Sequence, residues 1–113
     1  QADDFDFLKL LGNLYFLIDK PKTAYGYYKR AVEVARDDPA VNPIAVTHIE
    51  GRMAHTRGEF ELALDKFLAS TSSTTFRNHV GAVFDLGCCF MALEQWDQAQ
   101  DAFTRTLEMW FCS

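Results

Sequence analysis

The sequence predicts an all-α fold built as an array of antiparallel helix pairs. A glycine recurs at Gly12, Gly51 and Gly87, so that the copies begin 39 and then 36 residues apart. Each copy carries two stretches with apolar residues at helical spacing, and a period of roughly 34–45 residues with two such patterns marks a helical repeat array. No stretch alternates apolar and polar residues as a half-buried strand does. The sequence therefore predicts six helices in three pairs.

The composition indicates a folded domain and disfavours two classes of partner. The 113 residues are 49% hydrophobic and 14% aromatic, well above the content of a disordered segment. The formal net charge of −5 gives no general attraction to nucleic acid or to anionic membranes. The apolar runs are far shorter than a membrane span. We expect no nucleic-acid partner and no membrane insertion.

The first helix pair is expected at residues 5–38. Apolar side chains in residues 5–18 follow helical spacing, and two aspartates precede them, where the helix dipole favours negative charge. A turn at residues 19–21 places Pro21 in the first turn of the second helix, a position where proline is tolerated. This second helix is expected to end near Pro39.

The second pair is expected at residues 44–77. Asn42 precedes a proline and is expected to cap a helix over residues 44–56. Gly58 predicts the turn into a helix over residues 59–70.

The third pair is expected at residues 80–113. Hydroxyl side chains in residues 70–75 form a loop and are expected to cap a helix over residues 76–93. The last helix is predicted over residues 95–110.

This pattern resembles the tetratricopeptide repeat family, with about three repeats over nearly the whole chain. The resemblance implies a right-handed superhelical array of three antiparallel helix pairs. Small residues would lie where the two helices of a pair approach most closely, and large ones would fill the space beside them. The small residues are the three glycines with Ala24, Ala63 and Ala99, and the large ones are Tyr15, Tyr28, Phe60, Phe67, Phe90, Trp96 and Phe103.

The resemblance has departures, and the end of the chain lacks a feature of such arrays. The middle unit carries Thr47 and Glu50 where the family usually has apolar residues. A stacked array normally closes with a polar capping helix, whereas this chain ends on the apolar residues 109–111. We therefore expect residues 1–113 to form a single repeat domain that is a fragment of a longer chain.

In the family, the first helix of each pair lines a concave groove that binds peptides. The resemblance thus implies a protein or peptide partner, an adaptor or scaffold role and no cofactor. The groove surface would run from mixed polar through basic to apolar, which suits an acidic group beside a hydrophobic anchor; solvated helix faces are the alternative interpretation. We expect Arg52→Glu to abolish binding with little loss of fold. The candidate residues are Lys9, Asn13, His48, Arg52, His55, Phe84, Cys88 and Met91.

A more specific peptide site, the carboxylate clamp of chaperone-binding members, is matched only in part. Lys9 and Asn13 correspond to the first-unit half of that clamp. The remaining places hold Ile49, Gly81 and Asp85, and an aspartate there would repel the carboxylate to be bound. The sequence therefore disfavours this function.

A structural role is the alternative to groove binding. The exposed end of the array would then self-associate or stack end to end through Trp110 and Phe111 to give a homo-oligomer. RNA binding by a related helical-hairpin repeat is disfavoured by the acidic charge balance.

No catalytic or metal-binding pattern is present in the sequence. His48 and His55 lie two helical turns apart, too far for a compact metal site without a third ligand. Phosphate loops, nucleophile elbows and paired catalytic carboxylates are absent, so we expect no enzyme activity. Cys88 and Cys89 are adjacent on a helix and point apart, which favours reduced thiols in the cytoplasm, with the nucleus as the alternative.

Overall fold

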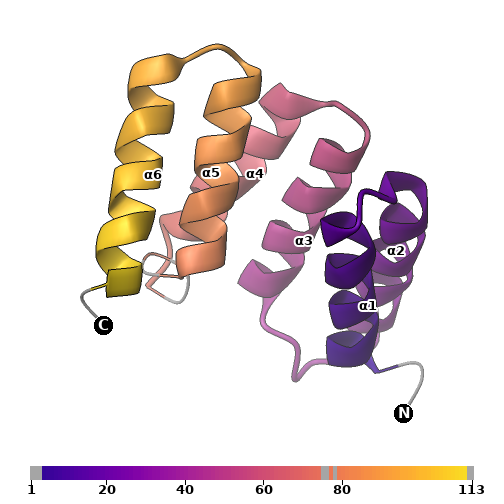
Figure 1. Ribbon diagram of the computed structural model, residues 1–113. Coiled ribbons are helices and arrows are strands. Elements are labelled where there is room, and N and C mark those ends of the chain that lie inside the picture. Colours follow the sequence, from indigo (N-terminus) through magenta and orange to yellow (C-terminus); the bar gives the residue numbers. More distant parts are fainter. Residues whose placement is uncertain (1–3, 75–76, 78, 112–113) are drawn as a thin grey trace.

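The computed structural model describes residues 4–74, 77 and 79–111, and within these residues it contains six helices and no strand. Consecutive helices form three antiparallel pairs, and the pairs stack through α2 on α3 and α4 on α5. Figure 1 shows the pairs side by side, with α1 and α6 at opposite ends. The all-α prediction is confirmed. The helices are α1 (Phe5–Leu17), α2 (Pro21–Arg36), α3 (Pro43–Thr56), α4 (Phe60–Thr71), α5 (Val80–Ala92) and α6 (Trp96–Phe111).

Each pair is held together by a glycine of its first helix that lies against an aromatic ring of its second. A Cβ atom added at any of these glycines would lie 2.5–2.6 Å from a ring carbon, closer than packed atoms approach one another. The recurring glycine therefore allows the ring to lie directly on the helix backbone. The three contacts are Gly12 with Tyr28, Gly51 with Phe67, and Gly87 with Phe103.

The second helices contribute small residues to the same interfaces, and one aromatic prediction is wrong. Ala24, Ala63 and Ala99 are all buried. Trp96, expected to fill the core, is 59% exposed. It is the first residue of α6, so no preceding turn of that helix covers its indole.

The same turn joins the two helices of every pair. Asp19, Gly58 and Glu94 occupy matching positions and have φ values of 61°, 76° and 59°. Such left-handed residues close helices in the Schellman motif, in which the following amide donates to a carbonyl five residues back. This bond measures 2.9 Å in all three pairs: Lys20 to Tyr15, Glu59 to Ala54 and Gln95 to Phe90.

The caps of α3 and α5 differ in how well the sequence predicted them. Asn42 caps α3 as expected, because its Oδ1 accepts from the amide of Ile44 at 2.9 Å. Helix α5 begins at Val80, and its cap is His79, whose Nδ1 accepts from the amide of Ala82 at 3.2 Å. The prediction that this helix starts at residue 76 with a hydroxyl cap was therefore wrong.

The hydroxyl groups of residues 70–73, which precede α5, form hydrogen bonds with the preceding helix α4 instead. The side chains of Ser70, Thr71, Ser72 and Ser73 donate to carbonyl oxygens of the last turns of α4. Their hydrogen bonds therefore close α4 and do not cap α5. Residues 75, 76 and 78 of this loop lie outside the described residues.

Candidate functional site

The candidate groove residues lie on the first helices of the pairs, and four of them gather around one small pocket. The pocket has a volume of about 100 Å³ and lies where α1, α3 and the start of α5 meet. We call it the basic pocket, because its lining includes two cations and two histidines and no carboxylate. It is lined by Lys9, Asn13, Ala45, His48, Ile49, Arg52 and His79.

Arg52, which lines this pocket, connects its own helix pair to the first and the third. Its Nε donates to Oδ2 of Asp85 on α5 at 3.0 Å, and its Nη1 donates to Oδ1 of Asn13 on α1 at 2.6 Å. The same Asn13 oxygen accepts from the hydroxyl of Tyr28 at 2.7 Å. The guanidinium also lies 5.7 Å from the ring centre of Phe16, a cation–π distance. Arg52 is therefore a structural crosslink as well as a pocket residue.

Asp85 is the buried counterion of this network. Its Oδ2 also lies 2.9 Å from Nε2 of His48, and the residue is only 2% exposed. Burial alone would raise the pKa of Asp85, but the hydrogen bond from His48 and the charge of Arg52 outweigh that effect and hold its pKa below the usual range. The carboxylate is thus ionised, and it also raises the pKa of Arg52 against the opposing effect of burial.

These contacts change what is expected of Arg52→Glu. A second carboxylate at this position would lie beside the buried Asp85 and leave Asn13 without its guanidinium donor. Such a change destabilises a buried pair by several kcal/mol. The structure therefore replaces the expectation of a small loss of fold with that of a large one, so other residues must report on binding.

One guanidinium nitrogen of Arg52, a lining residue of the basic pocket, is not used by this network. Among the described residues, Nη2 donates no hydrogen bond, while Nε and Nη1 are both engaged. A Cβ atom at Gly81 would lie 3.9 Å from Nη2, so the glycine leaves that approach free of a side chain. An anion entering here could accept from Nη2 beside Lys9.

The pKa values of the two other histidines of this region are lowered, chiefly by desolvation. Burial lowers the pKa of His79, and the nearby His48, with rings 6.0 Å apart, lowers it further. His55 packs edge-on between Phe16 and Phe60, at centroid distances of 5.4 and 5.2 Å. Burial lowers its pKa, and its buried Nδ1 has no hydrogen-bond partner among the described residues. His55 thus lies outside the basic pocket.

The α5 candidates form a separate, more apolar surface. Phe84 occupies the α5 position that matches Lys9 and His48, and it is half exposed; Met91, two turns further along, is exposed to a similar extent. Cys88 and Cys89 are free thiols, and the third cysteine lies outside the described residues. Burial and then Asp85 raise the pKa of Cys88 to about 11 and that of Cys89 to about 12, so neither is an activated nucleophile.

Three members of this network were not among the predicted site residues. Asp85 could have been found, because it is a charged residue at the helical position that holds Leu10 and Ile49 in the other units. The hydroxyl of Tyr28 and the ring of His79 gave no sequence signal, since Tyr28 was interpreted as core and His79 was placed inside the helix expected over residues 76–93. Their roles depend on contacts between helices far apart in sequence.

Two other features are absent from the described part of the chain. No group of three or more His, Cys, Asp or Glu residues there is arranged to hold a metal ion. None of its helices combines the length and apolarity that crossing a bilayer requires.

Three stacked helix pairs with a shared glycine contact and a shared turn define a tetratricopeptide-like α-solenoid. Two crystal structures of the MamA protein have this fold, each with a TM-score of 0.57 and 18% sequence identity. The matches cover 96% of this chain but only 56% and 60% of the MamA chains. No family model matches the sequence, and no curated protein matches it.

Proposed function

We propose that this chain is a non-catalytic protein-interaction module that binds an acidic segment of a partner in its concave groove. The observation that carries the proposal is the basic pocket, where Lys9 and Arg52 line one small cavity with no carboxylate in its lining. Asp85 neutralises part of the charge of Arg52, but Asp85 is buried and is not among the residues that line the pocket.

The neighbouring α5 surface supplies the second half of the proposed site. Phe84 and Met91 are exposed large apolar side chains on the helix that adjoins the pocket. A partner with a carboxylate in the pocket and an apolar side chain against α5 would gain charge-assisted hydrogen bonds and bury apolar area together. Cys88, between them on α5, would line the same path, and His55 would contribute packing only.

The proposal is tested by selecting peptides from a random library with the wild-type chain and titrating the best binder. We expect selected peptides to carry Asp or Glu close to a large apolar residue. Lys9→Glu and Phe84→Gln are each expected to weaken the best binder at least about tenfold, and salt is expected to weaken it further. Lys29→Glu, the same charge change on the exposed side of α2, serves as the matched control.

Two results would contradict this function. The first is a selection that yields no binder, and the second is an equal affinity for Lys9→Glu, Phe84→Gln and the Lys29→Glu control. Circular dichroism of each variant separates lost binding from lost fold.

A further inference from the structure

His79 caps α5 and lines the basic pocket with the same ring. Its Nδ1 accepts from the amide of Ala82 at 3.2 Å, and the residue belongs to the pocket lining. A ring nitrogen accepts a hydrogen bond only while it carries no proton, so this cap requires the neutral form of His79, with its proton on Nε2. A second proton would go to Nδ1 and place two donors opposite each other. Protonation of His79 is therefore incompatible with the cap.

The two cations of the basic pocket are already paired with carboxylates. Nζ of Lys9 lies 3.5 Å from Oδ1 of Asp6, and Nε of Arg52 lies 3.0 Å from Oδ2 of Asp85. A carboxylate that enters the pocket therefore meets two positive charges that are each offset by a partner. A proton on His79 would give the lining a further positive charge.

The groups around His79 oppose its protonation in the free chain. The charged and titratable side chains that face it are Lys9 of α1, His48 and Arg52 of α3, and Asp85 of α5. Burial lowers the pKa of His79 most, the three basic side chains of this set lower it further, and the carboxylate raises it. The carboxylate of a bound partner would act in the same direction as Asp85. Proton and partner would thus favour each other's binding.

Gly81 keeps the space beside the imidazole free of a side chain. A Cβ atom at this position would lie 3.2 Å from Cε1 of His79, closer than ordinary van der Waals contact, and 3.9 Å from Nη2 of Arg52. A larger residue would therefore press on the ring. The glycine leaves the ring accessible on the same side as the guanidinium nitrogen that the network does not use.

We propose that His79 couples binding of the acidic segment to uptake of a proton from solvent. In the free chain the neutral ring caps α5, and in the complex the protonated ring releases the amide of Ala82 and donates to the partner's carboxylate. This inference rests on the proposed binding function and adds its regulation by pH. One coupled proton changes an affinity by at most about tenfold per pH unit. Between pH 8 and pH 6, where Asp and Glu stay ionised, we expect the affinity to rise at least about threefold.

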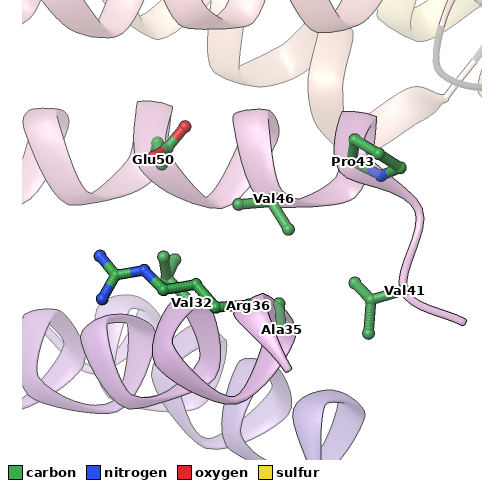
Figure 2. A pocket seen from close by; sticks show the side chains of 7 residues that line it. All are labelled: Val32, Ala35, Arg36, Val41, Pro43, Val46 and Glu50. Carbon is green, nitrogen blue, oxygen red and sulfur yellow. The ribbon is translucent and has the colours of Figure 1, made fainter. Parts of the chain in front are cut away.

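The larger pocket at the junction of α2 and α3 provides a matched control. It has a volume of about 300 Å³, and Figure 2 shows Arg36 of α2 and Glu50 of α3 on opposite sides of it. Its lining holds one cation and one carboxylate but no histidine. Arg36→Gln removes this cation, and we expect the variant to keep the pH dependence of the wild type.

Nuclear magnetic resonance of the histidine rings tests the proposal, with and without the acidic peptide selected from the random library. The sequence contains three histidines, and the ring signal that is missing from His79→Asn identifies His79. Asparagine keeps an acceptor at the cap but does not titrate. We expect the peptide to raise the pKa of His79. The affinity of His79→Asn should change less than about twofold between pH 8 and pH 6.

The outcomes separate this inference from the function on which it rests. A selection that yields no peptide would overturn both. A peptide that binds while the pKa of His79 stays unchanged, or while His48 takes up the proton instead, overturns this inference alone. A His79→Asn variant with the pH dependence of the wild type does the same. His79→Ser, which also keeps a cap acceptor, replaces His79→Asn if circular dichroism shows that the latter does not fold.

Discussion

Arg52 of α3 and Asp85 of α5 form a buried ion pair, with Nε and Oδ2 3.0 Å apart, that joins the second helix pair to the third. The side chain of Arg52 is 16% exposed and that of Asp85 is 3% exposed, so water screens the pair weakly. Through its bond to Asn13, the same guanidinium reaches the first helix pair. One polar network therefore connects all three pairs.

Removing one partner of this pair is expected to destabilise the fold strongly. Asp85→Ala would leave the Arg52 charge in a largely buried position and should lower the free energy of unfolding by about 3 kcal/mol. A double-mutant cycle with Arg52→Ala, followed by urea unfolding, should give a coupling energy of about 2 kcal/mol. Asp101→Ala on the exposed face of α6 should cost less than about 0.5 kcal/mol. A coupling energy near zero would show that the pair does not stabilise the stack.

The glycine contacts predict opposite effects for two Gly→Ala changes. Gly51→Ala would place a Cβ 2.6 Å from the ring of Phe67, and the overpacking should destabilise the fold by about 2 kcal/mol. Gly26 lies on α2, and a Cβ atom added there would have no atom within 4 Å. Gly26→Ala should therefore stabilise the fold by about 1 kcal/mol, because alanine has the higher helix propensity. Thermal unfolding of the two variants measures both effects. Equal shifts of the melting temperature would mean that the ring of Phe67 does not exclude a side chain at position 51.

The repeated turn predicts two stabilising changes. Asp19 and Glu94 hold the left-handed conformation that glycine adopts without steric cost. Asp19→Gly and Glu94→Gly should each raise the free energy of unfolding by about 0.5–1 kcal/mol, as measured in urea. Gly58→Ala should lower it by about 1 kcal/mol, since it adds a Cβ at a φ of 76°. A loss of stability in both glycine variants would contradict this account of the turn.

Stability is expected to fall in two steps as the pH is lowered. Burial holds the pKa of His55 below its ordinary value of 6.5, so the unfolded chain takes up a proton before the folded chain does. Stability is therefore complete above about pH 6.5 and declines as the pH falls toward the lower pKa of the folded state. His79 acts in the same direction, while Asp85 and Arg52 affect His55 with opposite signs.

The second loss of stability, at lower pH, is expected from Asp85. Its folded pKa lies below the ordinary value of 3.8, so its contribution is complete above about pH 4 and is lost as the pH falls through the folded value. Urea unfolding at a series of pH values should show a smaller loss near pH 6 in His55→Phe. The same series should show a smaller loss below pH 4 in Asp85→Asn. Profiles that match the wild type in both variants would assign the acid sensitivity to other groups.

The sequence by itself determined the fold class and most of the local structure. The three glycines, the helical spacing and the Asn42 cap are local signals, because each acts through residues within a turn or two of helix or through a repeat visible along the chain. The glycine repeat also predicted where helices approach closely, and the ring contacts confirm it. The predicted hydroxyl cap of α5 was wrong, because the hydroxyl groups of residues 70–73 lie between two helices and bond to α4.

Only the tertiary structure decided which candidate residues are crosslinks and which face a pocket. Sequence spacing placed His48, Arg52 and His55 on one helix face. The stacking of α5 then covered Arg52 with Asp85, and the rings of Phe16 and Phe60 enclosed His55. The bonds from Arg52 to Asp85 and to Asn13 join residues 33 and 39 positions apart. Electrostatic and packing energies depend on separation in space, which a periodic pattern along one chain does not contain.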